Sequence, residues 1–366
     1  MIRAAFRVDS GTLIGAGHLS RCLVLANEIK AIGGSSVFIG RNHEGNLLEL
    51  VASAGHDVIR LEPEFKALSD VSTWLGATPL ADAWQTFDAL NRLAPFDWII
   101  TDHYGIDASW HQVHRAGAAR LMAIDDLANR QMDVDLLLDQ NYGASEKPYP
   151  NLVGHATLLL GPKYALLDPS FNQARSATDG FHVSGPSELK VSLSLGGADP
   201  DDVTSWVLTA LQEQLRSARS INIIIGKGHP RPEAVERACQ PLPNASLHVQ
   251  TQRMAEILAH TDLAIGAGGI SALERACVGV ASIGLTVSDN QNAALRAMHH
   301  DGLLMHVPSS PPDVDGLRSA YIDLASNATK RAEMLHRCRR FVDGQGASRV
   351  TKVLMATPSV DTSNGR

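Results

Sequence analysis

The residues best suited to chemistry begin with a histidine at the end of a glycine-rich turn. The segment DSGTLIGAGH, residues 9–18, contains three glycines and ends at His18. An apolar strand, Ile2–Val8, is expected before it and a helix from about Leu19 after it. A glycine such as Gly17 has no Cβ, so its backbone can pass close to a ligand. A helix N-terminus disfavours imidazolium and would leave His18 neutral. The sequence therefore predicts a general base here, with a capping or packing histidine as the alternative.

Two neighbouring features bear on the ligand of this turn. The dinucleotide fingerprint G-x-G-x-x-G requires glycine where Ser20 stands, and no acidic residue ends a second strand near Ile39. A Rossmann oxidoreductase is therefore disfavoured. Arg7 and Asp9 flank the end of the first strand, and strand alternation would send both to the same face, beside His18. We expect them to contact a ligand, with a local ion pair as the alternative.

Polar side chains follow three further expected strands. The residues at these strand ends are Asp102, His103 and Tyr104, then Asp125 and Asp126, then Asp139, Gln140, Asn141 and Tyr142. Carboxyl ends of parallel strands meet at one edge of a sheet, so we expect a polyhydroxylated or amide-bearing ligand there. Solvated turns are the alternative. Adjacent residues such as Asp125 and Asp126 point to different faces, which makes a glycosidase pair awkward.

The second half of the chain contains glycine turns that could receive phosphate. Two turns and a later polar cluster contain Gly196, Gly197, Gly268, Gly269, Ser271, Asn290 and Gln291. Backbone N–H groups at a helix start can bind a diphosphate without many cations. Glu274, one turn into the helix that follows Gly269, could accept hydrogen bonds from ribose hydroxyls. A solvated helix carboxylate is the alternative for Glu274.

Metal ligands are weakly indicated. Asp-Val-Asp occurs at 133–135 and at 313–315 and is similar to the metal-binding acids of one class of glycosyltransferase. We interpret both as loop and cap residues. The four cysteines form no CxxC or Cys/His pattern, which argues against a zinc site and against a disulfide framework. No metal and no other cofactor is expected.

Short apolar runs alternate with helical patterns along the whole chain, which is typical of parallel sheets built from βαβ units. The expected strands are Ile2–Val8, Ser36–Ile39, Asp57–Leu61, Asp97–Thr101, Leu121–Asp125, Leu136–Asp139, Leu158–Leu160, Lys190–Leu195, Ile221–Ile225, Leu247–Val249, Leu263–Ile265, Ala281–Leu285 and Leu304–Val307. A Ser-, Gly- and Pro-rich stretch at 171–188 indicates a linker. We therefore expect two doubly wound α/β domains, at 1–175 and 188–355, facing a central cleft and followed by a flexible tail at 356–366.

Composition narrows the class of protein. The 366 residues are 44% hydrophobic and 19% charged, with a formal net charge of -7. This balance favours a globular protein and offers no bulk attraction for nucleic acid or anionic lipid. The first twenty residues lack an apolar signal segment, and no apolar stretch is long enough to span a membrane. We therefore expect a cytoplasmic protein, active as a monomer, with no nucleic-acid or membrane partner.

The motifs taken together resemble a known family. In order they are FRVDSGTLIGAGHLSRC, ITDHYG, IDD, QNY, GPKYALL, SLGGADP, GAGGISALERA, SDNQ and DGQGASRV. This set resembles the PseG family, the UDP-sugar hydrolases of pseudaminic acid biosynthesis, over about residues 2–354. The family also includes spore-coat polysaccharide proteins of unproven activity.

The resemblance implies a GT-B-type fold of two Rossmann-like domains. It places His18 on the catalytic histidine, and Glu274 and Asn290 on UDP-sugar contacts. The segment around Met254 and Ala255 would contact uracil through its backbone. One departure is Asp168, where the family usually has a basic residue, so a sugar or phosphate contact from this position is in doubt.

These observations predict that the first domain binds the sugar and the second binds UDP. The expected sugar contacts are Arg7, Asp9, Gly17, Asp102, His103, Tyr104, Asn141 and Tyr142. The expected UDP contacts are Gly196, Gly197, Met254, Ala255, Gly268, Gly269, Ser271, Glu274, Asn290 and Gln291. The resemblance implies metal-independent hydrolysis of UDP-2,4-diacetamido-2,4,6-trideoxy-β-L-altropyranose, with inverting attack of water at the anomeric carbon. A glycosyltransferase, a UDP-sugar 2-epimerase and a non-catalytic sugar-nucleotide binding protein remain alternatives on the same scaffold.

Overall fold

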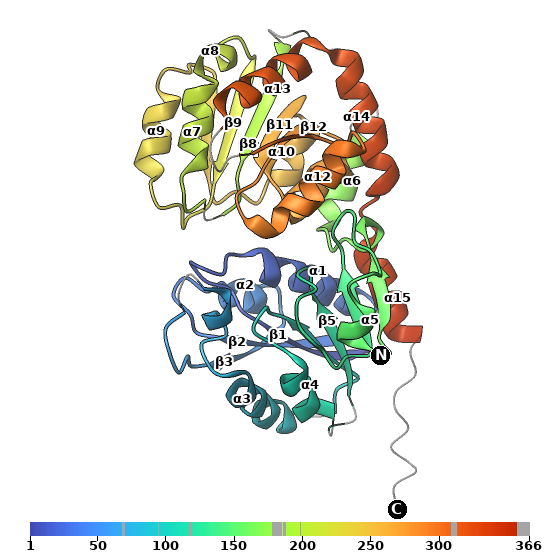
Figure 1. Ribbon diagram of the computed structural model, residues 1–366. Helices are drawn as coiled ribbons and strands as arrows, with labels where there is room; N and C mark the ends of the chain where they lie inside the picture. Colours follow the sequence, from blue (N-terminus) through green and yellow to red (C-terminus); the bar gives the residue numbers. More distant parts are fainter. Residues whose placement is uncertain are drawn as a thin grey trace, which may run out of the picture. The chain divides into compact units, whose positions relative to one another are not determined.

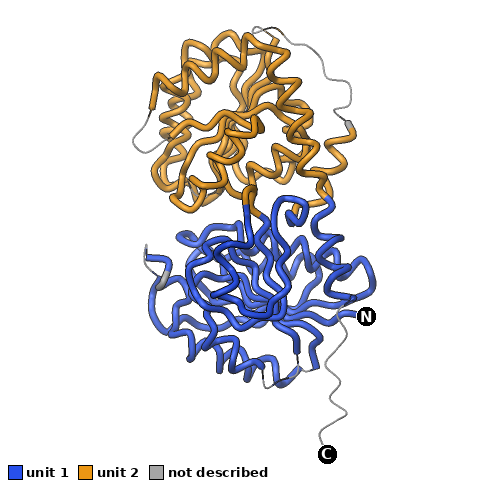
Figure 2. The backbone as a smooth tube through the Cα atoms, turned by 45° about the vertical axis from the view of Figure 1, so that its right-hand side comes forward, with its two compact units in different colours: residues 1–140, 144–166, 345–366 blue, residues 141–143, 167–344 orange. Residues whose placement is uncertain are grey.

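The chain forms two compact α/β units (Figure 2). Unit 1 comprises Met1–Gln140, Ala144–Leu166 and Gln345–Arg366, and unit 2 comprises Asn141–Gly143 and Leu167–Gly344. The structure is a computed structural model, and it describes residues 1–67, 70–93, 95–115, 117, 119–177, 185, 188–197, 199–308 and 313–356.

Unit 1 is built on a seven-stranded parallel sheet with the order β3-β2-β1-β4-β5-β6-β7. Its strands are β1 (Arg3–Val8), β2 (Ser35–Arg41), β3 (Asp57–Leu61), β4 (Trp98–Asp102), β5 (Arg120–Ile124), β6 (Leu136–Asp139) and β7 (Thr157–Leu160). Every residue of β4 is buried, as expected for a central strand covered on both faces. The strand order reverses between β1 and β4, and doubly wound sheets bind ligands at such a point.

Helices cover both faces of this sheet (Figure 1). They are α1 (Gly17–Ala31), α2 (Leu48–Ser53), α3 (Pro79–Asn91), α4 (Ala108–Arg115), α5 (Pro150–Val153) and α15 (Gly346–Ala356), with the short 3-10 turns η1 (Val71–Thr73) and η2 (Pro162–Tyr164). One apolar core joins the sheet to α1, α2 and α15, and a second joins it to α3, α4 and α5. The sheet is therefore packed against an apolar core on each of its two faces.

Unit 2 is built on a six-stranded parallel sheet with the order β10-β9-β8-β11-β12-β13. Its strands are β8 (Lys190–Ser194), β9 (Ser220–Ile225), β10 (Ala245–Val249), β11 (Leu263–Ala267), β12 (Ala281–Leu285) and β13 (Met305–Val307). Its helices are α6 (Pro169–Ala177), α7 (Val203–Ala210), α8 (Gln212–Leu215), α9 (Pro232–Cys239), α10 (Met254–Ala259), α11 (Ile270–Val278), α12 (Asn292–His300), α13 (Val314–Ser326) and α14 (Ala328–Phe341), with η4 (Asp289–Gln291). The strand order reverses between β8 and β11.

The predicted strands are confirmed, because each overlaps an observed strand. The predicted domain limits need correction. The helix α6 occupies the start of the expected linker and packs against α10 and α11 of unit 2. The helix α15 returns to unit 1 and packs against α1, with Val350 and Leu354 in its core. Most of the rest of the linker, and the tail beyond Ala356, lie outside the described residues.

The described helices differ in length and hydropathy from membrane-spanning helices. None combines the length and the apolar character needed to cross a bilayer.

Candidate active site

The switch point of unit 1 brings the turn before α1 next to the end of β4. In the parallel pairing of β1 with β4, Val8 lies opposite Asp102, the last residue of β4. The turn that leaves β1 is closed by a bridge between Gly11 and Gly15, and α1 begins at Gly17. His18 therefore sits in the first turn of α1, with Asp102 beside it.

His18 and Asp102 form a carboxylate–histidine pair. Nδ1 of His18 lies 2.6 Å from Oδ1 of Asp102. We assign the proton to Nδ1, because the carboxylate is an acceptor. No partner binds Nε2 of His18 among the residues that the structure describes. The His18 side chain is 11% exposed.

Arg21 holds Asp102 in place. Its Nε donates to Oδ2 of Asp102 and its Nη2 to Oδ1, each at 2.6 Å, which is the bidentate geometry of a strong ion pair. Burial alone would raise the pKa of Asp102, but Arg21 and His18 outweigh it and hold that pKa well below its usual range. The carboxylate therefore stays ionised behind the histidine.

Tyr104 completes the surroundings of His18. Its hydroxyl donates to Oδ1 of Asp126 at 2.8 Å, and its ring meets the His18 ring edge to face, with centroids 4.8 Å apart. Asp126 also lies 3.4 Å from Nη1 of Arg21. Sequence reasoning missed Arg21 as a functional candidate. Its position three residues after His18 on one helix face was the available signal.

Arg7 and Asp9 do not lie at the surface, as a sugar contact would require. Both side chains are fully buried. Arg7 donates to Asp9 at 2.7 Å and to both oxygens of Asp82, a residue of α3. Arg41 and the indole of Trp110 also donate to Asp82. The alternative of a local ion pair is correct, and it is part of a larger buried network.

His103 and Asp102 also belong to the interior. Burial lowers the pKa of His103 to about 4, so its imidazole is neutral. Its Nδ1 accepts the backbone N–H of Gly105 at 2.9 Å, and its Nε2 faces Oδ2 of Asp9 at 3.6 Å. Of the residues predicted to bind the sugar after β4, Tyr104 is the one that remains partly exposed.

Asn141 and Tyr142 belong to unit 2, not to the cluster around His18. The Tyr142 hydroxyl donates to Oδ2 of Asp301 at 2.6 Å, and its ring packs against Phe341. The prediction placed them with the polar ends of the first sheet because they directly follow β6. The chain changes units at this point, and the sugar contacts predicted for both residues stay predictions.

In unit 2 the glycine turns follow β8 and β11, the strands at its switch point. Gly196 has a φ of 94° and Gly269 one of 65°, conformations that other residues rarely adopt. An added Cβ would meet nothing within 4 Å at Gly196 or Gly197, so the turn is open on that side, while the backbone of Gly197 packs against Gly226. A phosphate group of a ligand could approach the turn there.

Gln291 supports the second glycine turn. Its Oε1 accepts the backbone N–H groups of Gly268 at 3.2 Å and of Val287 at 3.3 Å. The N–H of Gly268 is therefore occupied by Gln291. The UDP contacts predicted for both residues stay predictions. Asn290 is exposed beside Gln291 on η4.

Glu274 is half-buried on α11. Burial and the nearby Asp168 raise its pKa to about 7, against the influence of Arg275 and of a hydrogen bond with Ser271. The unusual residue Asp168 thus acts on Glu274 within unit 2. Met254 and Ala255 are the first residues of α10, where no side chain caps the helix start.

Three acidic or imidazole side chains at the start of α7 lie close enough to suggest a metal site: Asp199, Asp202 and His229. Their hydrogen bonds indicate another role. Asp199 accepts the backbone N–H groups of Val203 and Thr204, and Asp202 accepts that of Ser205. Nδ1 of His229 accepts a backbone N–H, so Nε2 carries the proton and faces Asp199 at 3.3 Å. In this arrangement the carboxylates cap the start of α7.

Three of the four Asp-Val-Asp carboxylates have partners too. Asp133 and Asp135 pair with Arg115, and Asp313 caps α13 by accepting the N–H of Gly316. The interpretation of Asp313 as a cap residue is confirmed.

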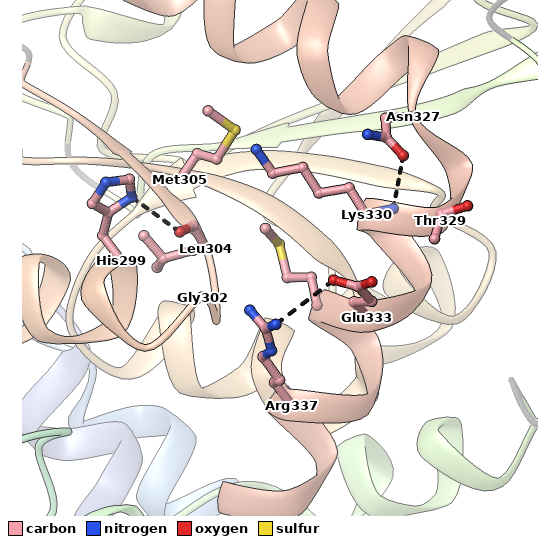
Figure 3. Close-up of a pocket in the computed structure, with 10 residues that line it drawn as sticks. His299, Gly302, Leu304, Met305, Asn327, Thr329, Lys330, Glu333 and Arg337 are labelled. Atoms are coloured by element: carbon pink, nitrogen blue, oxygen red, sulfur yellow. Dashed lines mark hydrogen bonds and ion pairs between the residues drawn. The ribbon is translucent and has the colours of Figure 1, made fainter.

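Each unit has a pocket among the residues that the structure describes. One of about 500 Å³ in unit 1 is lined by the loops after β1, β2 and β3, residues 11–14, 42–44 and 63–67. Leu13 and Phe65 at this pocket are 49% and 42% exposed. The other, of about 360 Å³, lies at the start of β13 and includes Lys330 and Arg337 of α14 (Figure 3). It is at the amino edge of the unit 2 sheet, away from the glycine turns.

Comparisons with known proteins agree with this architecture. No protein-family model matches the chain. It is 29% identical over 205 residues to the spore coat polysaccharide biosynthesis protein SpsG of Bacillus subtilis, covering 55% of this chain and 59% of that protein. It is 20% identical over 261 residues to the UDP-2,4-diacetamido-2,4,6-trideoxy-beta-L-altropyranose hydrolase of Campylobacter jejuni, covering 70% and 81%. The chain thus spans about three fifths of the length of the first relative.

Solved structures share the whole fold. MurG of Acinetobacter baumannii has a TM-score of 0.66 at 13% identity, covering 98% of this chain and all of that one. The calicheamicin glycosyltransferase CalG4 has a TM-score of 0.61 at 16% identity, covering 97% and 98%. The fold is therefore GT-B-like, as predicted.

Proposed function

We propose that this protein hydrolyses a UDP-sugar, UDP-2,4-diacetamido-2,4,6-trideoxy-β-L-altropyranose, to UDP and the free sugar. The observation that supports this proposal most strongly is the His18–Asp102 pair. Nδ1 of His18 is bound to a buried carboxylate, and Nε2 has no partner among the described residues. The distant similarity to the hydrolase of Campylobacter jejuni supports the choice of reaction and substrate.

The reaction proceeds by attack of water on the anomeric carbon. Nε2 of His18 takes a proton from the water as its oxygen bonds to that carbon. The bond between the anomeric carbon and the diphosphate oxygen breaks, and its electron pair leaves with UDP. The configuration is inverted, because water attacks from the face opposite UDP. Asp102 stabilises the imidazolium that forms, as carboxylates do behind catalytic histidines.

Unit 2 binds the UDP portion in this proposal. The open turn at Gly196 and Gly197 and the start of α11 receive the diphosphate through backbone N–H groups. Glu274 accepts a hydrogen bond from the ribose, Asn290 contributes a polar contact, and the start of α10 contacts uracil. These backbone donors stabilise the leaving charge, so the mechanism requires no metal.

The pocket of unit 1 favours one second candidate, a glycosyltransferase. Such an enzyme needs a site for an acceptor, and the cavity beside the turn that leads to His18 has exposed apolar side chains at Leu13 and Phe65. The same base would then deprotonate an acceptor hydroxyl in place of water.

One experiment separates these functions. The purified protein is incubated with the UDP-sugar alone and the products are followed by NMR, with the H18N variant as control. UDP together with free sugar supports hydrolysis. UDP formed only when an acceptor is added indicates a transferase, a change in sugar configuration with UDP still attached indicates an epimerase, and binding without turnover indicates a binding protein.

A further inference from the structure

Arg275 is a buried guanidinium with few partners. It lies on α11 and is 4% exposed. Its Nη2 donates to the carbonyl oxygen of Ala267 at 2.6 Å, and its buried Nε has no hydrogen-bond partner among the described residues. Buried polar groups in native proteins are nearly always paired, so this nitrogen requires an explanation.

The position of Arg275 is at the switch point of unit 2. A Cβ added to Gly266 of β11 would overlap with the guanidinium and would lie 2.8 Å from the carbonyl oxygen of Ser194 at the end of β8. Ala267, which Arg275 binds, directly precedes the turn at Gly268 and Gly269. The charge is thus placed directly behind the second glycine turn.

The charge of Arg275 is incompletely balanced. Burial lowers its pKa to about 10, with Glu274 acting in the opposite direction, so the side chain remains cationic at neutral pH. Within the described part of the chain, no carboxylate oxygen lies within 4.0 Å of its nitrogens. Glu274, the adjacent acid, has a pKa of about 7 and is only partly ionised there. A buried cation without a counter-charge is costly, and an anionic ligand at the turn would offset that cost.

We propose that Arg275 supplies the fixed positive charge for the diphosphate of the nucleotide bound at the glycine turns of unit 2. It acts from behind the turn at Gly268 and Gly269, through electrostatic attraction and by holding the carbonyl of Ala267. It is therefore a positioning residue. This inference rests on the proposal that unit 2 binds UDP, and it makes the site selective for nucleoside diphosphates over nucleosides.

The test measures the affinities of UDP, uridine and inorganic pyrophosphate by calorimetry. The variants are R275M, which removes the charge at similar volume, and R275K, which keeps it. The matched control is R331M, because Arg331 is also fully buried in unit 2 and also donates to backbone carbonyls, those of Leu324 and Ala325. Circular dichroism melts establish that each variant is folded.

We expect R275M to weaken UDP and pyrophosphate binding roughly ten- to a hundredfold, as loss of a charge-assisted interaction does, with uridine binding unchanged within about twofold. R275K should retain most of the preference for UDP over uridine, and R331M should leave that preference unchanged. If R275M folds poorly, R275K decides alone. R275K should then bind UDP more tightly than uridine.

The inference is overturned if R275M keeps the wild-type preference, or if R275K and R275M lose UDP and uridine equally, since that is the signature of a structural role. A wild-type protein that binds neither UDP nor pyrophosphate also overturns it. Failure of the proposed function is distinct, because it would appear as UDP binding in the wild type without hydrolysis of the UDP-sugar.

Discussion

At the residue scale, the proposed chemistry depends on one nitrogen atom, Nε2 of His18. In the H18N variant we expect kcat to fall by more than about a hundredfold, because a general base acts in the transition state. UDP affinity should stay within a few fold, since the proposed uridine and diphosphate contacts belong to unit 2. Turnover assays and UDP calorimetry check both parts. A variant that keeps most of its kcat would remove His18 from the mechanism.

Asp102 should matter through His18 and not through the sugar. In D102N, the amide can donate to Nδ1 and so stabilise the tautomer with its proton on Nε2, which cannot accept a proton from water. We expect kcat to fall by roughly a hundredfold or more with UDP affinity unchanged. The pair with Arg21 also weakens, so a melt is measured in parallel. An increase in KM with normal kcat would instead indicate a direct substrate contact by Asp102.

The carboxyl of Glu274 links stability to pH. Its pKa is raised from 4.5 to about 7 in the folded protein, so between these values the native state binds more protons than the unfolded state. This contribution to stability is fully present below pH 4.5 and is lost as the pH rises through about 7. The melting temperature of the wild type, measured relative to E274Q, should therefore decline across this window. A constant difference between the two proteins would show that Glu274 titrates normally.

At the element scale, the proposed mechanism uses helix starts and glycine turns, in place of metal cations, to stabilise the charge of the diphosphate. Asp133 and Asp135 of the first Asp-Val-Asp motif bind Arg115, and Asp313 of the second caps α13. Asp199 and Asp202 cap α7. These elements leave backbone N–H groups as the proposed partners of the diphosphate.

We therefore expect hydrolysis to survive treatment with EDTA. Activity is measured before and after chelation and dialysis, with magnesium or manganese added back. Loss of activity that either ion restores would contradict the metal-independent mechanism and would direct attention back to the acidic clusters.

At the scale of the whole molecule, the base and the glycine turns belong to different units. His18 lies in unit 1, and the turns proposed to receive the diphosphate lie in unit 2. In the proposed mechanism the base therefore acts on the sugar part of the substrate. The chemical consequence is that water attacks carbon and not phosphorus.

Hydrolysis in oxygen-18 water should thus place the label on the anomeric hydroxyl of the sugar and none on UDP. Mass spectrometry of both products decides this. Label in UDP would mean attack at phosphorus, and the mechanism would be wrong even with the right substrate. A sample of free sugar kept in labelled water without enzyme controls for exchange through ring opening.

The sequence by itself determined the strands and the glycine turns. Runs such as Trp98–Thr101 and Leu263–Ile265 are apolar because parallel strands are buried on both faces, so local composition reveals them. The turns at Gly196 and Gly269 could be predicted for a similar local reason, because their positive φ values exclude most residues other than glycine. His18 was recognisable because its turn lies between a strand and a helix.

Only the tertiary structure decided which polar side chains are buried and which groups they pair with. Arg7 is buried because α3 brings Asp82 against it, 75 residues away in the chain. Asp102 became the partner of His18 because β4 pairs with β1, and Arg21 joined it from α1. Likewise α15 is an ordinary amphipathic segment, and packing against α1 assigned it to unit 1. Burial and pairing depend on residues distant in sequence, so they follow from the packed fold and not from local pattern.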